Sequence, residues 1–513
     1  MGPMVSIILP TFNRPLYLSQ AISSAVRQRY GNIQIIVVND GGCDVSGIVK
    51  SFGDPRIVFI NRQHNRGKAF SLNEAIATAK GKYIAYLDDD DIYYPHHIET
   101  LVNAVESHSD CGAAYTDLYK SYCRIEPNGR RTVLSKVVEV SRDFDRFLML
   151  YFNHVLHVSC LHRKDLLEKT GPYNEKLNVL IDWDMTRRLA FFTDFFHIPE
   201  VTGEYYNPQG ENDRISVQRR KNKAEYAGNV FAIRTARPAK PWSKIADLSI
   251  IFVADRLNQE AGNTVGLIWR HTFYPYKLYL PLPGEDFARL NTEMPNIVQV
   301  AVSPDCTQLQ RIDRILADCE GQYVAIVPAG FRIRDMWLED SLYALLNTAE
   351  PNEAFELEDS TPDCWAVVAR KEHLQLARGK FPHLPLRDGL ISAGVNVRRI
   401  RPDEIPFQFD SLLMEAQNEE KAGNWRQAAE IYGHIGEHHH NQLWMKALVA
   451  NALFEAGDMV KAAELVSLIT KNVLQWIRCC LRRNLNAGIK ISSRRQLCSK
   501  KRKTCLPIPT SSA

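Results

Sequence analysis

The segment GKYIAYLDDDDIYYP, residues 81–95, joins an apolar run at 83–87 to four consecutive aspartates. Short apolar runs with such polar flanks are typical of strands that are buried on both faces of a sheet. Three similar runs precede it, at 5–9, 33–38 and 57–60. Apolar residues at helical spacing lie between the runs, at Leu18, Ala21, Ile22 and Ala25 and again at Leu72, Ala75, Ile76 and Ala79. The alternation predicts an α/β fold with a parallel, doubly wound sheet.

Acidic residues follow two of the predicted strands. Asp40 comes after 33–38, and the aspartates at 88–91 come after 83–87. Ligands of open α/β sheets bind just beyond the carboxyl ends of the strands, and hard divalent cations are commonly held by one or two carboxylates plus substrate phosphates. We therefore expect a metal–diphosphate site, in which Asp88 and Asp90 share one side if the strand geometry persists. The alternatives are a solvated acidic turn and, at Asp40, an Asx turn.

A basic loop, HNRGK at residues 64–68, precedes the predicted helix that contains Leu72. Cations at a helix N-terminus are well placed to meet phosphate alongside backbone N–H groups. Either Arg66 or Lys68 is expected to contact phosphate, and the sequence does not choose between them. The alternative is a solvated basic loop.

Four segments together resemble the nucleotide-sugar half of an inverting family 2 glycosyltransferase of the GT-A fold. They are VSIILPTFNRP, IIVVNDGG, HNRGKAFSLNEAI and GKYIAYLDDDDIYYP, and they cover about the first 110 residues in the family's order. The acceptor half extends the likeness to about residue 217, and within it GPYNEKLNVLIDWDMTRRLA at 171–190 resembles the family's stretch in which an acidic residue precedes Trp-Asp. The resemblance implies a hexosyltransferase-type enzyme that needs Mn²⁺ or Mg²⁺. It also implies a nucleotide-sugar donor, expected to be a UDP-sugar, and a glycan, lipid-linked or protein acceptor in glycan or polysaccharide biosynthesis.

The resemblance also assigns roles to residues. It implies that Asp182 is the general base, and that Asp88 and Asp90, the DxD-type residues, hold the ribose and the metal. The remaining residues implied in nucleotide-sugar binding are Pro10, Thr11, Asn13, Asp40, Arg66, Lys68 and Asp89. Ile181 stands where the family usually has a first acid before the tryptophan, which leaves Asp184 as an alternative base. A nucleotidyltransferase on a similar sheet and a non-catalytic sugar-nucleotide-binding scaffold are the rival functions.

An internal repeat follows the first 220 residues, which we assign to the catalytic domain. Residues 248–254 (LSIIFVA) resemble 5–11 (VSIILPT), and 321–327 resemble 81–87 at an offset of 240. We expect 221–247 to be a linker and 248–403 to be a degenerate GT-A-like copy. Pro328, Ala329 and Gly330 replace the aspartates there, so we expect no metal in this copy. An unrelated α/β domain is the alternative.

The segment from residue 408 onward is expected to be helical and then basic. The pattern GNW…AAE at 423–430 recurs as GDM…AAE at 457–464, a period of 34 that resembles a tetratricopeptide pair within 408–472. Such a pair suggests a protein partner, although an ordinary helical hairpin remains the alternative. Residues 465–513 carry 11 Lys or Arg and no Asp or Glu, so the rest of the chain has a net charge of 4 − 11 = −7.

The tail at 473–513 predicts contact with an anionic membrane surface rather than a nucleic acid, and the alternative is a solvated extension. The N-terminus shows no signal-peptide pattern, and no apolar run is long enough to span a bilayer. The 11 cysteines are scattered, which is typical of a reducing compartment. We therefore expect a cytoplasmic protein, peripheral at the inner membrane face.

Overall fold

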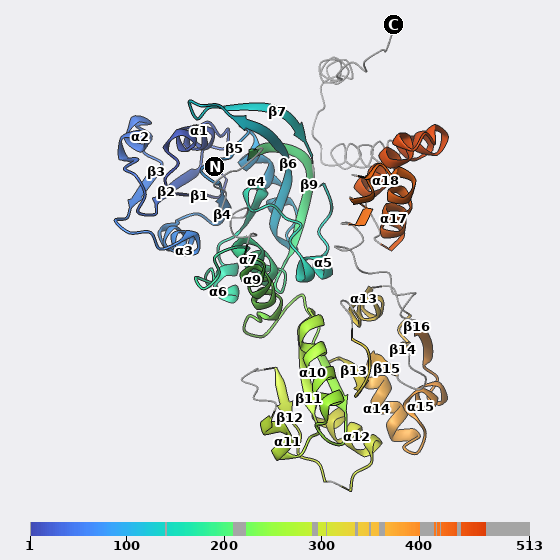
Figure 1. Ribbon diagram of the computed structural model, residues 1–513. Coiled ribbons are helices and arrows are strands. Elements are labelled where there is room, and N and C mark those ends of the chain that lie inside the picture. The colour runs from blue at the N-terminus through green and yellow to red at the C-terminus, as the bar shows by residue number, and fades with distance from the viewer. Residues whose placement is uncertain are drawn as a thin grey trace. The chain divides into compact units, whose positions relative to one another are not determined.

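The chain forms two compact units, Met1–Gln408 and Phe409–Ala513, in a computed structural model (Figure 1). The structure describes the following residues: 2–138, 141–208, 222–289, 296–303, 305–333, 337–347, 350–358, 365–400, 415–416, 418–420, 422–438 and 443–467. The basic tail at 473–513 and the segment 209–221 lie outside the described residues.

The first sheet has the strand order β3-β2-β1-β4-β8-β6-β9-β5, with β7 paired to β6. Its strands are β1 Val5–Thr11, β2 Ile33–Asn39, β3 Ile57–Asn61, β4 Tyr83–Tyr86, β5 Ile92–Tyr93, β6 Cys111–Ile125, β7 Arg131–Val137, β8 Cys160–Arg163 and β9 Asp194–Pro208. The four predicted strands are confirmed, and they run parallel. The sheet as a whole is mixed, because β8 is antiparallel to both β4 and β6.

Helices cover this sheet and fix the polar loops at its carboxyl edge. They are α1 Pro15–Val26, α2 Ser46–Ser51, α3 Lys68–Thr78, α4 His97–Ser107, α5 Arg146–Tyr151, α6 Leu166–Thr170, α7 Ile181–Leu189 and α9 Lys223–Thr235, with a short 3₁₀ turn η1 at His157–Ser159. The predicted apolar face of α1 is buried, as is every residue of β1 and β2. The segment 221–247, expected to be a linker, contains α9.

A second sheet has the order β12-β11-β10-β13-β15-β14-β16. Its strands are β10 Leu248–Val253, β11 Tyr276–Leu280, β12 Ile297–Gln299, β13 Tyr323–Pro328, β14 Glu353–Glu358, β15 Trp365–Arg370 and β16 Asn396–Ile400. Its helices are α10 Gln259–His271, α11 Gly284–Arg289, α12 Gln308–Asp318, α13 Glu339–Asn347, α14 Lys371–Lys380 and α15 Leu386–Ser392. Order and strand directions repeat those of β3-β2-β1-β4-β8-β6-β9.

One hydrogen bond recurs at matching positions of the two sheets. The Gly81 amide donates to Ser6 Oγ at 2.9 Å, and the Gly321 amide donates to Ser249 Oγ at 2.9 Å. Both serines are fully buried. The bonds join β1 to the turn before β4 in the first sheet and β10 to the turn before β13 in the second. The same hydrogen bond therefore fixes this strand pair in both sheets.

The second unit contains α17 Trp425–His438 and α18 Leu443–Glu455. Gly423 and Gly457, 34 residues apart, both have positive φ angles, of 80° and 82°. The Gly423 amide donates to the Glu420 carbonyl, and the Gly457 amide donates to the Phe454 carbonyl, both at 3.0 Å. The turn before each repeated segment therefore has one geometry, which glycine adopts without strain. None of the described helices has the length and apolarity to cross a membrane.

Candidate active site

Three aspartate side chains converge in the turn that follows β4. The Asp91 amide donates to the Asp88 carbonyl at 3.1 Å, which closes the turn. Carboxylate oxygens of Asp88, Asp90 and Asp91 lie within 4.8 Å of one another. The strand geometry does not persist through these residues, because β4 ends at Tyr86. The turn groups Asp88 with Asp90 instead, and it adds Asp91.

Asp89 is buried and does not belong to this cluster. Its carboxylate accepts a hydrogen bond from Thr11 Oγ1 at 2.7 Å and pairs with Arg14 at 3.3 Å. Burial, followed by the negative charge of Asp90, raises the pKa of Asp89 to about 6. Thr11 is 3% exposed. A buried hydrogen bond therefore joins the end of β1 to the aspartate turn.

Lys68, the first residue of α3, connects the aspartate cluster to Asp182. Its Nζ donates to Asp88 Oδ1 at 2.6 Å. Burial acts to lower the pKa of Lys68, but the charges of Asp88, Asp182 and Asp90 outweigh it, so the pKa is raised. One ammonium group thus lies within electrostatic reach of three predicted site carboxylates, and these residues share one region of the carboxyl edge.

Arg66 has a different environment from Lys68. Its side chain is exposed, and the guanidinium lies 3.3 Å from the centre of the Phe70 ring. The backbone amides of Arg66 and Gly67 donate to the Asp40 carboxylate at 2.8 and 2.9 Å, and Arg62 pairs with the same carboxylate at 3.1 Å. Asp40 therefore fixes the loop before α3 against the end of β2. These hydrogen bonds also help to hold Lys68, the next residue, in place.

Asp182 lies in the first turn of α7. Its Oδ2 accepts a hydrogen bond from Asn153 Nδ2 at 3.0 Å. Burial raises the pKa of Asp182, and the positive charge of Lys68 only partly opposes that shift. Leu180, immediately before α7, has a φ of 60°. This conformation costs a leucine about 1–2 kcal/mol, and such strain is typical of functional sites.

Asp184, the alternative that the sequence leaves open, is buried and ion-paired. It is 2% exposed and pairs with Arg188 at 2.6 Å within α7. Ile181, which stands where the resembling family has an acid, is buried. Asp182 is therefore the acidic residue of α7 that lies within reach of Lys68.

Two further predicted residues lie near the end of β1. Pro10 is a buried residue of that strand, opposite Val38 of β2. Asn13 has a φ of 58°, and its Oδ1 accepts a hydrogen bond from the Cys43 amide at 2.8 Å. Asn13 therefore fixes the relation between the loops that follow β1 and β2.

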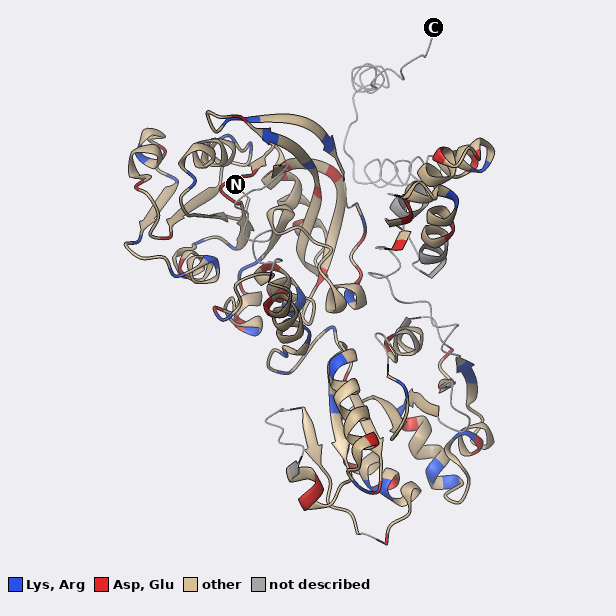
Figure 2. Ribbon diagram, viewed as in Figure 1, with Lys and Arg blue, Asp and Glu red and all other residues tan. Residues whose placement is uncertain are grey.

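Two arginines that sequence reasoning missed contact the aspartate turn. Arg14 Nη1 pairs with Asp90 Oδ2 at 2.9 Å. Arg131 of β7 donates to the Asp90 carbonyl at 2.5 Å, and its guanidinium stacks over Tyr206 at 3.6 Å. Figure 2 shows basic residues in blue along β7. Arg14 follows β1 closely, so its place at the carboxyl edge of the sheet could have been predicted from the sequence. Arg131 reaches the turn through the pairing of β7 with β6, which the sequence does not reveal.

The corresponding turn of the second sheet has no acidic residue. The Ala329 amide donates to the Val253 carbonyl at 3.0 Å, two residues beyond the position that matches the bond from the Leu87 amide to the Ile8 carbonyl in the first sheet. Pro328, Ala329 and Gly330 follow, and Gly330 has a φ of 86°. Within the described ranges, the aspartate turn of the first sheet is the one grouping of three side chains suited to a metal.

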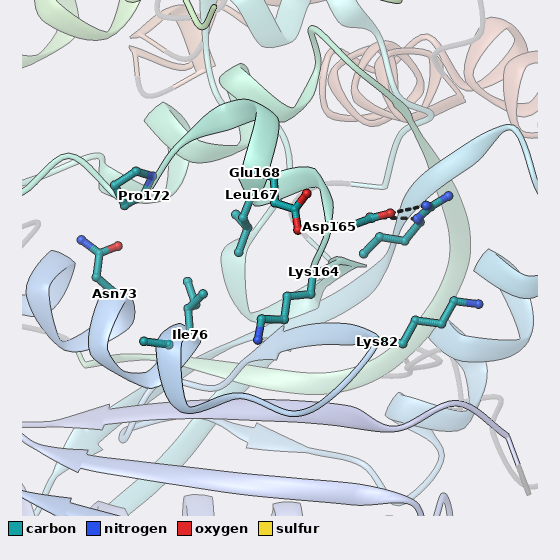
Figure 3. Close-up of a pocket in the computed structure, with 10 residues that line it drawn as sticks. Asn73, Ile76, Lys82, Lys164, Asp165, Leu167, Glu168 and Pro172 are labelled. Carbon is teal, nitrogen blue, oxygen red and sulfur yellow. Dashed lines mark hydrogen bonds and ion pairs between the residues drawn. The ribbon is translucent and has the colours of Figure 1, made fainter.

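A hollow of about 650 Å³ lies elsewhere on the first domain (Figure 3). It is lined by residues of α3, α6 and the loops between them, including Ile76, Lys82, Lys164 and Leu167. Lys82 precedes β4, whereas Asp88 follows it, so the hollow lies toward the amino end of that strand. The hollow and the aspartate turn therefore lie at opposite ends of β4.

The sheet order and the acidic turn at its carboxyl edge define a GT-A-type α/β domain. Residues 6–162 match the family described as "Glycosyl transferase family 2". An uncharacterized glycosyltransferase of Methanocaldococcus jannaschii is 30% identical over 249 residues, which are 45% of this chain and 83% of the relative. The chain therefore belongs to the family 2 glycosyltransferases.

Two further comparisons cover smaller shares of the relatives. An uncharacterized glycosyltransferase of Rickettsia prowazekii is 35% identical over 195 residues, 36% of this chain. The chain spans only 58% of that relative's length. Among solved structures, S. aureus TarS 1–349 in complex with UDP-GlcNAc is 17% identical and has a TM-score of 0.37, with 47% of this chain and 68% of that chain covered.

Proposed function

We propose that the chain is a metal-dependent inverting glycosyltransferase, which moves a sugar from a nucleotide-diphosphate sugar to a hydroxyl acceptor in glycan or polysaccharide biosynthesis. The carrying observation is the position of Lys68: its Nζ donates to Asp88 Oδ1 at 2.6 Å, and the charges of Asp182 and Asp90 also raise its pKa. A group that can hold a diphosphate and a group that can remove a proton therefore lie in one region. The resemblance of the N-terminal segments to the family supports a UDP-sugar as donor.

The aspartate turn supplies the donor side of the proposed reaction. The oxygens of Asp88, Asp90 and Asp91 lie within 4.8 Å of one another, a hard-ligand set that fits Mn²⁺ or Mg²⁺. When bound, the ion supplies positive charge that stabilises the departing diphosphate. Lys68 and Arg14 border the same turn, so their charges favour an anionic leaving group there.

Asp182 supplies the acceptor side. Its carboxylate takes the proton of the attacking hydroxyl, and attack from the face opposite the leaving group inverts the anomeric carbon. The raised pKa of Asp182 makes it a stronger base than an exposed aspartate. General-base catalysis of this kind contributes about 10²–10⁴-fold. Asn153 orients the carboxylate through the hydrogen bond to Oδ2.

A donor screen tests this proposal. The full chain is incubated with Mn²⁺, an acceptor mixture and single nucleotide sugars, and nucleoside diphosphate release is measured. We expect release with at least one donor, with loss of the signal in chelator. Release of pyrophosphate from a nucleoside triphosphate and a sugar phosphate would instead establish a nucleotidyltransferase. The absence of turnover with any donor, together with nucleotide binding, would favour a scaffold.

We also propose roles for the other parts of the chain. The matching strand order and the matching Ser–Gly bonds support 248–403 as a degenerate GT-A-like copy. The repeated turns at Gly423 and Gly457 support a tetratricopeptide-like pair that contacts a protein partner. The basic composition of 465–513 supports a peripheral position on an anionic membrane, at its cytoplasmic face.

A further inference from the structure

Arg187 of α7 is fully buried, and its guanidinium binds backbone carbonyls of three separate segments. Nε donates to the Leu150 carbonyl at 3.2 Å, at the end of α5. Nη1 and Nη2 donate to the Ala236 and Arg234 carbonyls at 2.7 and 2.8 Å, where α9 ends. Nη2 also donates to the Phe273 carbonyl at 3.1 Å, in the loop between α10 and β11 of the second sheet.

The buried guanidinium of Arg187 destabilises the fold unless all of its hydrogen bonds are formed. Burying a guanidinium removes its hydration, and hydrogen bonds to well-placed acceptors must replace it. Among the described residues, no carboxylate forms an ion pair with Arg187; its partners are carbonyl groups. Its geometry therefore depends on all three segments being in place at once, including the loop of the second sheet.

Two routes connect Arg187 to Asp182. The first is α7 itself, because both residues belong to this nine-residue helix. The second runs through α5: Arg187 binds the carbonyl of Leu150, and Asn153, three residues later, donates to Asp182 Oδ2. A shift of the Phe273 loop thus acts both on the helix that carries Asp182 and on the residue that orients its carboxylate.

The second sheet holds its side of this contact firmly. Glu339, fully buried in α13, accepts hydrogen bonds from the Phe273 and Tyr274 amides, both at 3.0 Å. The Phe273 ring lies 5.0 Å from the ring of Tyr151, the last residue of α5. The Phe273 loop is therefore fixed by α13 on one side and presents a carbonyl and an aromatic ring to the first domain on the other.

We propose that Arg187 is a positioning residue through which the second sheet fixes α7 and α5, and with them Asp182. The second sheet then contributes to the reaction without binding a donor itself. The kinetic part of this proposal rests on the proposed function. The structural part does not, because the order of α7 and α5 can be measured without any substrate.

Hydrogen exchange of the full chain tests the structural part. Arg187→Met keeps much of the side-chain volume but removes every donor, and we expect exchange of peptides over 146–153 and 181–190 to speed up at least tenfold. Glu339→Ala, which changes only the second sheet, is expected to have the same effect on these peptides. Arg311→Met is the matched control, because Arg311 is also buried but binds the Ala254 and Cys306 carbonyls within the second sheet. We expect that control to leave both peptides unchanged.

Kinetics test the positioning role. We expect Arg187→Met to lower kcat at least tenfold while the donor KM stays within about twofold, since small displacements of a catalytic group lower the rate of the chemical step. If Arg187→Met does not fold, Arg187→Lys retains the charge with fewer donors and is expected to give a smaller loss of the same kind.

Wild-type exchange in Arg187→Met would overturn the proposal, as would faster exchange in Arg187→Met that Glu339→Ala does not reproduce at 146–153 and 181–190. A wild-type chain without turnover on any donor would refute the proposed function, while the exchange result would still decide the role of Arg187.

Discussion

Asp182 combines two properties that a general base needs: a raised pKa and a hydrogen-bond donor that orients it. Asp182→Asn keeps the size of the side chain and removes the base, so we expect kcat to fall by about 10²–10⁴-fold. Donor affinity, measured by calorimetry, is expected to change little. Asp165→Asn is the control, because Asp165 pairs with Arg163 at an exposed position. Full activity in Asp182→Asn would remove this residue from the mechanism.

The raised pKa of Asp182 also fixes the direction of the pH dependence. The base acts as a carboxylate, which exists only above its pKa, and burial shifts that pKa above the ordinary value of 3.8. Activity is therefore lost as the pH falls through the raised value. We expect the acid limb of the kcat/KM profile to lie above pH 3.8, and an Asp182→Glu variant that retains turnover to show a displaced limb.

Asp90 is the residue on which metal dependence is most simply tested. Asp90→Asn removes one carboxylate of the three that converge in the turn, and we expect the Mn²⁺ affinity to fall at least about tenfold. Isothermal titration with Mn²⁺ alone gives this value without a substrate. Unchanged Mn²⁺ affinity in Asp90→Asn, or turnover that persists in excess EDTA, would contradict the proposed ion site.

His197 provides a second pH-dependent group, in the half of the domain that carries Asp182. Its ring lies between Asp117 at 2.9 Å and Asp143 at 3.0 Å. Burial acts to lower the pKa of His197, but the hydrogen bonds to the two aspartates outweigh it and raise the pKa. The stabilisation is therefore complete at low pH and is lost as the pH rises through the raised value.

Comparing the wild type with His197→Gln at two pH values measures this effect. We expect the wild type to be more stable by about 1–3 kcal/mol at pH 6, the usual value of charged hydrogen bonds. The difference should shrink at pH 9. Denaturant unfolding at both pH values measures the free energy of unfolding of the two proteins. If the stability difference between wild type and His197→Gln grew with pH, the predicted pH dependence would be wrong.

At the scale of single elements, the Ser6–Gly81 and Ser249–Gly321 hydrogen bonds hold β1 beside β4 and β10 beside β13. A Cβ on Gly81 would lie 2.6 Å from the Ser6 amide nitrogen and 2.7 Å from the Tyr83 carbonyl oxygen. Backbone atoms cannot move aside, so we expect Gly81→Ala to destabilise the chain by about 1–3 kcal/mol. Gly321→Ala should behave alike, since its Cβ would lie 2.5 Å from the Ser249 amide nitrogen.

The matched control is Gly47→Ala. Gly47 lies in α2, and a Cβ there would have nothing within 4 Å. Alanine is favoured over glycine in helices by about 1 kcal/mol, so this variant is expected to be neutral or stabilising. Thermal unfolding compares the three variants. A neutral Gly81→Ala would show that the turn before β4 can shift, and that its close contact is not a constraint.

The sequence predicted the first four strands because buried parallel strands read as apolar runs. The acidic loops predicted a site at Asp88 and Asp90, the family resemblance added Asp182, and the choice between Arg66 and Lys68 stayed open. The sequence could not predict Asp91 as a neighbour of Asp88, because that depends on where β4 ends and how the turn closes. Arg187 had no sequence signature at all, since its partners are backbone carbonyls of distant segments.

At the scale of the whole molecule, the basic composition of 465–513 predicts electrostatic attachment to membranes. We expect deletion of 473–513 to weaken binding to vesicles that contain phosphatidylserine by at least about tenfold in low salt. Vesicle sedimentation measures the binding, and phosphatidylcholine vesicles are the control that should bind neither protein. Equal binding of the full and truncated chains would rule out the tail as the attachment site.

Because the two sheets share one topology within a single chain, the effects of mutations at matching positions can be compared directly. Mutational tolerance should be similar in the two sheets at positions that hold paired strands together, as at Gly81 and Gly321. It should diverge after β4 and β13, where the first sheet carries the aspartate turn and the second carries Pro328, Ala329 and Gly330. A saturation scan scored for growth would then separate, position by position, what the architecture demands from what the reaction demands.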